Sequence, residues 1–346
     1  MKRIKIAGQW VGEGEPVYLV AEIGGNFQDF PTAVKLIDLA KASGVHAVKL
    51  QHYRADTLAS RKAMFDMENT GVISQYELFK KYELSDALTG KIVAYCREKQ
   101  IPVFSTPSHS TDVNQLRKYD LPVYKIGSDD AVNIPFLRYV AKEGKPMIVS
   151  TGMCTMEEIQ RSVNAILEEG NDQIILLHCV SNYPAHIKDV NLKAMQAMQA
   201  HFDFPVGYSD HTLGIDACYT AAALGASLLE FHFTYDKKAP GPDHMLSKAN
   251  EETVALVKRL QELYAMMGDG VKHPASSEEK NRRNNRKSLV LTQNVKAGEK
   301  ISPENIDIKR PGYGIPPQDY SRALGKVAKR DLKADDILNW DDLSIP

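Results

Sequence analysis

Two histidines stand at the ends of two successive strand-like segments, and their spacing raises the question of a metal site. His211 lies in "GYSDHTLG" (207–214), beside Ser209 and Asp210. His232 follows in "LLEFHFTYD", at the end of another apolar run. Neutral imidazole nitrogens are common ligands of divalent metals. Whether the two histidines can share one metal depends on the fold that positions them.

Composition and charge exclude several classes of protein. The chain has 346 residues, of which 43% are hydrophobic and 25% charged, and its formal net charge is −1. No global field attracts nucleic acid or a membrane surface, so we expect neither as a partner. Because the N-terminus has no apolar signal sequence and no segment approaches the ~20 apolar residues of a membrane span, we expect a cytoplasmic protein. The 4 cysteines are widely spaced, which favours reduced thiols over a disulfide framework.

Short β-branched runs alternate with amphipathic helical stretches from residue 17 to about residue 270. The expected strands are "VYLVAEIG", "HAVKLQ", "IPVFSTP", "PVYKIGS", "KPMIVSTG", "QIILLHCV", "FPVGYSD" and "ASLLEFHF". Apolar strands separated by helices favour a parallel sheet that is covered on both faces. These units number eight, which predicts an α/β fold of the (β/α)8 TIM barrel type. No GxGxxG or P-loop pattern follows the first strand, which disfavours a doubly wound sheet.

The character of the chain changes near its C-terminal end. We expect the barrel to occupy residues 1–272 and a polar, charged linker to follow at residues 273–287. Residues 288–346 contain short strand-like pieces between turns that are rich in Pro and Gly, which indicates a small, mostly β domain. So small a module has little core of its own, and we expect it to pack against something.

Polar residues stand at the C-terminal ends of all the expected strands, where a (β/α)8 barrel builds its chemistry. They are Glu22, Asn26, Lys49, Gln51, Ser105, Thr106, Lys125, Ser128, Ser150, Thr151, Ser181, Asn182, Ser209, His211 and His232. Two lysines and several hydroxyls at one mouth predict a site for a phosphate or a phosphorylated acid. A lysine that points into a barrel must be paired, and a bound anion would pair it.

The ends of successive strands are neighbours, ~4.8 Å apart in a parallel sheet. A period of two residues turns Glu230 and His232 inward and Phe231 outward, toward the helices. Two imidazoles at the mouth would hold a divalent metal and leave its other positions open for water and substrate. Such a site serves a catalytic metal that polarises a carbonyl.

Three other side chains bear on this hypothesis. His178, on the sixth strand, and His109, in a loop, compete for the role of metal ligand. Asp210 either fixes the tautomer of its neighbouring histidine or caps the following helix, and we favour the first.

The motifs together resemble a known family. They are "AEIGGN", "VKLQ", "FSTP", "YKIGS", "STGM", "LHCVSNYP", "GYSDHTLG", "EFHFT" and "PGPDH", in this order. The ordered set resembles the sialic acid synthases, the nonulosonic acid synthase family. "KRPGYGI" followed by "LGKVAKRDLKADDIL" resembles that family's C-terminal antifreeze-like (SAF) domain. The resemblance covers nearly the whole chain.

The resemblance implies an enzyme, a transferase that forms a C–C bond. It would condense phosphoenolpyruvate with an open-chain N-acetylated amino sugar to give a nine-carbon 2-keto acid and phosphate. A divalent metal, typically Mn²⁺, would be held at His211 and His232. The implied phosphoenolpyruvate ligands are Lys49, Thr106, Lys125, Ser128, Ser150 and Ser209. The implied sugar contacts are Glu22, Asp130, Asn182, Tyr183, Asp243 and Arg310.

Further implications concern catalysis and assembly. Glu22 would act near the metal, as a general acid/base or as an orienting group. The resemblance also implies a homodimer in which the C-terminal domains are swapped, so that Arg310 reaches the sugar in the partner subunit.

This sequence differs from the family motifs more at the positions that would contact the amino sugar than at those that would bind phosphoenolpyruvate. Phe27 stands where a histidine is common, and Asp129 and Asp130 replace a Gly-Glu pair. N-acetylmannosamine is the default acceptor, and the alternative is another 2-acetamido sugar, as in legionaminic or pseudaminic acid synthesis. Two other readings are a sugar-binding barrel without activity and a metal-dependent aldolase that uses pyruvate and releases no phosphate. Because both histidines and both lysines are present, the first of these two is disfavoured.

Overall fold

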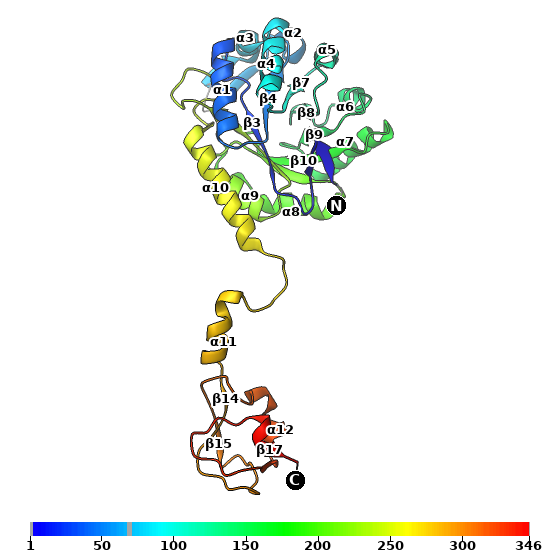
Figure 1. The fold of residues 1–346 in the computed structure, drawn as a ribbon. Coiled ribbons are helices and arrows are strands. Elements are labelled where there is room, and N and C mark those ends of the chain that lie inside the picture. Colours follow the sequence, from blue (N-terminus) through cyan, green and yellow to red (C-terminus); the bar gives the residue numbers. More distant parts are fainter. Residues whose placement is uncertain (1–2, 68–70, 346) are drawn as a thin grey trace. The chain divides into compact units, whose positions relative to one another are not determined.

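A computed structural model describes residues 3–67 and 71–345 (Figure 1). The chain divides into two compact units, Met1–Met267 and Gly268–Pro346. This division does not test the domain and linker boundaries that the sequence predicts at residues 272 and 287, so they stay predictions.

The first unit is built on a closed barrel of parallel strands. In chain order its strands are β3 (Tyr18–Glu22), β4 (Ala47–His52), β7 (Val103–Pro107), β8 (Tyr124–Ile126), β9 (Met147–Ser150), β10 (Ile174–Cys179), β11 (Val206–Asp210) and β12 (Leu228–Thr234). Each pairs in parallel with its neighbours in this order, and β12 pairs with both β11 and β3, which closes the ring. The predicted TIM barrel is therefore confirmed, with all of the expected strands present.

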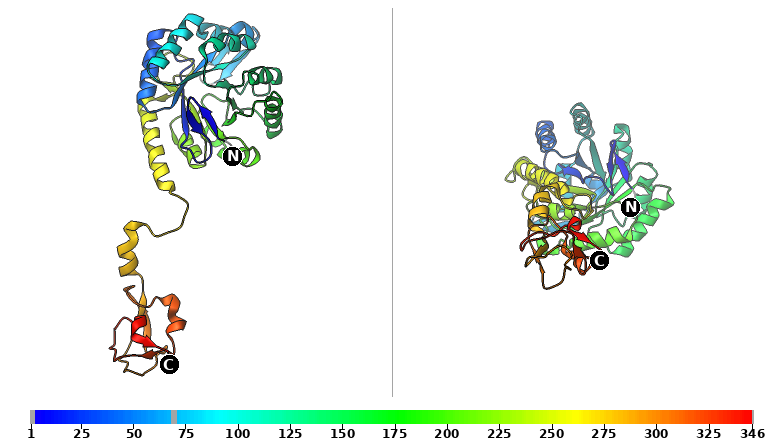
Figure 2. Two further views of the ribbon diagram at one scale, coloured as in Figure 1. Left: turned by 45° about the vertical axis from the view of Figure 1, so that its right-hand side comes forward. Right: turned by 60° about the horizontal axis from the view of Figure 1, so that its bottom comes forward.

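A helix follows each barrel strand and packs on the outside of the barrel (Figure 2). These helices are α1 (Phe30–Ala42), α4 (Asp86–Glu98), α5 (Ser110–Leu116), α6 (Ile134–Ala141), α7 (Met156–Glu168), α8 (Leu192–His201), α9 (Asp216–Ala223) and α10 (Asn250–Met267). Their starts follow from local sequence. Asp29 caps α1, which has Pro31 in its first turn. Thr155 and Glu158 form the predicted capping box of α7.

Alternation along the strands divides the apolar core into two layers. Leu228 belongs to a cluster inside the barrel, whereas Phe231 and Phe233 belong to the layer between strands and helices. The predicted orientation of β12 is therefore confirmed, and Glu230 and His232 point into the barrel. An N-terminal hairpin, β1 (Ile4–Ile6) with β2 (Gln9–Val11), joins the inner cluster. The hairpin closes the N-terminal end of the barrel, which leaves the C-terminal end for a site.

The connection between β4 and α4 is longer than the others and carries its own elements. These are α2 (Ala55–Leu58), β5 (Met64–Met67), β6 (Gly71–Ser74) and α3 (Gln75–Tyr82), where β5 and β6 pair in an antiparallel hairpin. After the last barrel strand, the short β13 (Lys248–Ala249) pairs with the end of β12. Both additions lie at the C-terminal end of the barrel.

The second unit is a small domain with short antiparallel pairs. β14 (Ser288–Leu291) pairs with β15 (Ile306–Lys309), and β16 (Val327–Ala328) pairs with β17 (Leu343–Ser344). Within residues 331–338, Leu332 and Ile337 make only isolated bridges, to Val295 and Val290. Contrary to expectation, the domain has a continuous core of its own. It contains Leu289, Leu291, Val295, Ile301, Ile306, Ile315, Ala323, Ala328, Leu332, Leu338 and Leu343.

The segment predicted as a linker contains a short helix, α11 (Glu279–Asn285). Its residues are all exposed, so it buries no apolar face and needs no hydrophobic periodicity. The second unit also has the short helix α12 (Tyr320–Ala323). In the described part of the chain, no helix is both long and apolar enough to cross a membrane.

Candidate active site at the mouth of the barrel

A cavity of about 530 Å³ opens at the C-terminal ends of the barrel strands. Most of the polar residues predicted at the strand ends line it, and so do side chains from the connection between β4 and α4. The predicted site residues among its lining are Lys49, Thr106, Lys125, Ser128, Ser150, Tyr183, Ser209, His211, His232 and Asp243. The size is in the usual range for a pocket that binds small molecules. The predicted strand ends therefore converge on one cavity.

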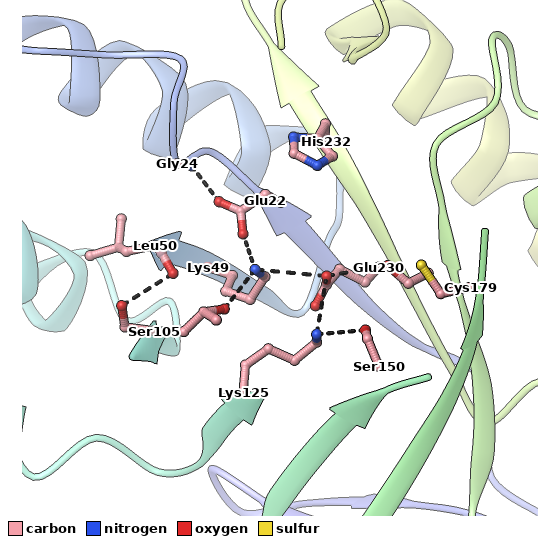
Figure 3. Close-up of polar contacts among 12 residues, drawn as sticks. Glu22, Gly24, Lys49, Leu50, Ser105, Lys125, Ser150, Cys179, Glu230 and His232 are labelled. Atoms are coloured by element: carbon pink, nitrogen blue, oxygen red, sulfur yellow. Dashed lines mark hydrogen bonds and ion pairs between the residues drawn. The ribbon is translucent and has the colours of Figure 1, made fainter. Parts of the chain in front are cut away.

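Four buried charges form an array at the base of the cavity (Figure 3). Lys49 forms a close ion pair with Glu22 and donates a hydrogen bond of 3.0 Å to Thr106 Oγ1. Glu230 Oε1 lies 3.7 Å from Lys49 Nζ and 3.7 Å from Lys125 Nζ. One carboxylate thus bridges two lysines.

Burial and mutual attraction shift the pKa of each group in this array. Burial raises the pKa of Glu22, and Lys49 offsets only part of that effect. Burial alone would lower the pKa of Lys49, but Glu22 and Glu230 outweigh it and raise that pKa. Burial lowers the pKa of Lys125, and Glu230 offsets this in part. For Glu230 burial alone would raise the pKa, but the lysines hold it below its usual value. Lys125 is therefore the cation with the least compensation, and a bound anion would supply more.

Hydroxyls and a glycine surround the Lys125 end of the array. Lys125 Nζ donates to Ser150 Oγ at 2.6 Å, and Ser128 Oγ accepts from the Gly152 backbone N–H at 3.0 Å. A Cβ at Gly152 would lie 2.8 Å from Ser128 Oγ and closer still to Ser181 Oγ, so only glycine fits between these serines. Ser181 Oγ is buried and has no hydrogen-bond partner among the described residues. Hydroxyls around a buried ammonium group, one of them without a partner, are suited to an anionic ligand.

The two histidines face each other across the mouth, with ring centroids 5.4 Å apart. His211 Nδ1 lies 2.9 Å from the Val180 carbonyl oxygen, which can only accept a hydrogen bond. Nδ1 therefore carries the proton and Nε2 is left with a lone pair, as a metal ligand requires. His232 Nδ1 lies 3.3 Å from Asp243 Oδ2. No cluster of three or more His, Cys, Asp or Glu side chains suited to a metal occurs among the described residues. The residues present fit a metal with two protein ligands and several open positions.

The competing histidines are directed elsewhere. His178 Nε2 lies 2.7 Å from the Val190 carbonyl oxygen, on the helix side of β10. His109 caps α5 through a hydrogen bond from the Thr111 backbone N–H. Neither histidine lines the cavity, so the pair at His211 and His232 is the one that the fold brings together.

Asp210 performs neither of the two roles considered for it. It does not fix the tautomer of His211, because the Val180 carbonyl does, and α9 has no side-chain cap. Its carboxylate instead pairs with Lys248 Nζ at 2.6 Å and accepts hydrogen bonds from Tyr208 and Thr212. Burial alone would raise the pKa of Asp210, but Lys248 outweighs it and holds the pKa low. The buried pair anchors the end of β11, immediately before His211.

Several predicted sugar contacts are placed differently from the expectation. Asp130 accepts a hydrogen bond from Asn133 at 2.8 Å, and Asn182 donates to the Pro184 carbonyl oxygen at 2.9 Å. Neither lines the cavity, whereas their neighbours Asp129 and Ser181 do. In each loop the backbone turns the adjacent residue inward, so the geometry favours the neighbours. Arg310 belongs to the second unit, and its role on the sugar stays a prediction.

Two charged residues of the site were missed from the sequence. Glu230 was expected to point inward but was given no role. The requirement that two buried lysines be paired would have identified it. Lys248, in "HMLSKANEE", reads as a surface lysine, and no local signal indicates its burial.

Known protein families match most of the chain. Residues 36–272 match the model of the NeuB family, and residues 286–344 match the SAF domain. The chain is 38% identical to an N,N'-diacetyllegionaminic acid synthase of Campylobacter jejuni, over 92% of this chain and 98% of that protein. It is 37% identical to a synthase of the same name from Legionella pneumophila, over 96% of each chain.

A solved structure shows the same fold. It is the N-acetylneuraminic acid (sialic acid) synthetase of Leptospira borgpetersenii, crystallised with citrate. The identity is 30% and the TM-score 0.72, over 81% of this chain and 95% of that one. The chain therefore belongs to the NeuB family and carries a C-terminal SAF domain. It is a phosphoenolpyruvate-dependent nonulosonic acid synthase, an enzyme that forms a C–C bond.

The pair of Asp210 and Lys248 gives a prediction about stability. Replacing Lys248 with Met leaves a buried carboxylate unpaired, so we expect the free energy of unfolding to fall by about 3 kcal/mol. Urea unfolding at pH 7 measures the change. Lys142→Met is the matched control, because Lys142 is 64% exposed in its pair with Glu169, and we expect it to lose at most about 0.5 kcal/mol. Equal losses in the two variants would contradict the structural role of the buried pair.

Proposed function

We propose that this enzyme condenses phosphoenolpyruvate with an open-chain N-acetylated amino sugar and water, giving a nine-carbon 2-keto sugar acid and phosphate. N-acetylmannosamine is the simplest acceptor of this kind. The names of two relatives, N,N'-diacetyllegionaminic acid synthases, support a diacetylated acceptor as the alternative. One observation carries the proposal. Two buried lysines and several hydroxyls lie in the same cavity as two facing histidines.

The two ends of the cavity suit the two substrates. Lys125, Ser150 and Ser128 offer a cation and hydroxyls to the phosphate and carboxylate of phosphoenolpyruvate. Lys49, held by Glu22 and bonded to Thr106, adds a second cation. Tyr183 packs on His211, with ring centroids 4.1 Å apart, and would face the sugar together with Asp243. In the proposed complex the C3 carbon of phosphoenolpyruvate would face the sugar aldehyde.

The reaction then follows from this placement. The enol C3 forms a bond to the aldehyde carbon, and the aldehyde oxygen takes a proton. Water adds to C2 and gives up one proton, and the new C2 hydroxyl passes its proton to the phosphate as the C2–O bond to the phosphate breaks and the 2-keto group forms. Glu22 is the carboxyl group suited to moving a proton here, because burial raises its pKa and it lies opposite His232 in the pairing of β3 and β12.

We also propose that His211 and His232 hold a divalent metal, with Mn²⁺ as the favoured ion, which when bound polarises the sugar aldehyde. The Nδ1–H tautomer of His211 and the open positions around the pair support this part of the proposal.

A homodimer with swapped C-terminal domains completes the proposal. It would bring Arg310 to the sugar in the partner subunit. The second unit has a core of its own, which supports a domain that can be swapped between subunits as one folded unit.

Phosphate release tests the reaction. The purified chain with Mn²⁺, phosphoenolpyruvate and a 2-acetamido sugar should release phosphate in step with the loss of both substrates, and neither substrate alone should be consumed. Condensation of the sugar with pyruvate in place of phosphoenolpyruvate would instead identify an aldolase.

Removal of the metal should abolish turnover. We expect chelation, His211→Ala and His232→Ala each to stop phosphate release, and each histidine variant to weaken Mn²⁺ binding at least about tenfold. Titration of free Mn²⁺ by electron paramagnetic resonance measures the binding. His109→Ala is the matched control and should bind Mn²⁺ as the wild type does. Full activity in metal-free buffer would refute the metal role.

Replacing Glu22 with Gln separates its two possible roles. The amide keeps the size of the side chain but cannot transfer the proton, and its single oxygen can accept from only one of the Gly24 N–H and Lys49 Nζ. If Glu22 moves a proton, kcat falls by a factor of about 10² to 10⁴ while KM for phosphoenolpyruvate changes little. A loss below tenfold would assign Glu22 an orienting role instead.

A further inference from the structure

One side of the active-site cavity is apolar, and the reaction itself does not require this. We call the apolar wall the six residues Tyr53, Leu58, Phe65, Leu78, Phe79 and Tyr82, all of which line the cavity. All come from the long connection between β4 and α4, which also places Gln75 in the lining, where its amide donates a hydrogen bond of 3.1 Å to the Met64 carbonyl oxygen. Apart from Tyr53, which is buried, they are only half-buried, so they present apolar surface to the cavity. The charges and hydroxyls described above come from the strand ends instead.

The apolar wall is built before any ligand arrives. The ring of Phe79 meets those of Tyr53 and Phe65 edge to face, at centroid distances of 5.2 Å and 5.5 Å. The helices that carry the wall are tied together, because Glu83, which follows α3, accepts a hydrogen bond of 2.5 Å from the Ala55 backbone N–H at the start of α2. Edge-to-face aromatic packing is rigid and specific. The wall therefore has a defined shape to which a ligand must conform.

The apolar wall lies beside the acceptor end of the cavity. Asp243 raises the pKa of Tyr53, for which burial is the larger cause, and it does the same for Tyr82. The same carboxylate lies 3.3 Å from His232 Nδ1. The wall thus adjoins the histidine that would hold the aldehyde end of the sugar, and the rest of the sugar would extend along it.

Three cations near the apolar wall are engaged with carboxylates, and Lys81 Nζ lies over the ring of Tyr82, 5.4 Å from its centroid. Arg54 and Lys80 pair with Glu83 at 3.8 Å and 3.1 Å, and Arg61 pairs with Asp56 at 3.8 Å. Of the described residues between β4 and α4, none that lines the cavity is charged. A phosphate on the acceptor would find no counter-ion in this wall.

We propose that the apolar wall selects an acceptor whose end remote from the aldehyde is apolar. The class is a deoxy amino sugar with a terminal methyl group and acylated amino groups, in preference to a sugar that ends in a hydroxymethyl group or a phosphate. A hydroxyl buried against aromatic and aliphatic carbon loses its hydrogen bonds to water, whereas a methyl group gains contact there. This inference rests on the proposed function, since it concerns the acceptor of that reaction.

Two acceptors that differ at one atom test the selection. We would compare N-acetylmannosamine with its 6-deoxy analogue, and then with 2,4-diacetamido-2,4,6-trideoxymannose, by steady-state phosphate release with Mn²⁺ and phosphoenolpyruvate. We expect kcat/KM to be about tenfold higher for the 6-deoxy analogue than for N-acetylmannosamine, and highest for the diacetamido sugar. The 6-phosphate of N-acetylmannosamine should be the poorest acceptor.

A substitution in the apolar wall should change the ratio. Leu78→Gln places a hydrogen-bonding group there, and we expect it to reduce the preference for the 6-deoxy analogue to about twofold while KM for phosphoenolpyruvate stays unchanged. Leu78→Met keeps the wall apolar and should keep the preference. Val72→Gln, on β6 of the same connection but 74% exposed, is the matched surface control and should behave as the wild type.

The outcomes distinguish this inference from the function on which it rests. Phosphate release with no preference, or with a preference for the 6-hydroxyl or 6-phosphate acceptor, overturns the inference and leaves the function in place. No phosphate release from any acceptor overturns both. The comparison of acceptors on the wild-type protein decides the matter even if a wall variant fails to fold.

Discussion

The active site depends on the burial of four charges inside a closed barrel. An isolated lysine or glutamate is costly to bury, so Glu22, Lys49, Lys125 and Glu230 must compensate one another. Strand register sets the array, because Glu22 pairs with Lys49 across β3 and β4 and with His232 across β12 and β3. A shift of one residue in either pair would turn one of these side chains toward the helices. The closed barrel prevents that shift, since each strand is held by two neighbours.

The cavity divides its tasks between two kinds of surface. The barrel strands supply the charged base, which the chemistry of phosphoenolpyruvate requires. The long connection after β4 supplies the apolar wall, which can change without disturbing the strands. Enzymes on this fold commonly keep reaction groups on strand ends and vary the loops above them. In this chain a common reaction and a particular acceptor can therefore be specified by separate parts of one cavity.

The sequence predicted the barrel, its strands and the convergence of their ends, because each signal is local. Apolar runs, capping residues and alternation act within a few residues of the chain. Alternation describes strands but not loops, where backbone turns set the direction of each side chain. The sequence therefore offered no basis for choosing Asp130 and Asn182 over their neighbours. Asp129 and Ser181 face the cavity in their place. Lys248 was missed because its burial depends on Asp210, a residue far away in the sequence.

The sequence by itself determined the fold, the family and the set of reactive residue types. The tertiary structure decided which of them meet. It placed Glu230 between two lysines, assigned the tautomer of His211 to the Val180 carbonyl and paired Asp210 with Lys248. The physical reason is the range of the interactions. Secondary structure follows from neighbours along the chain, whereas the compensation of buried charge and the shape of a pocket arise between segments that only the closed barrel brings together.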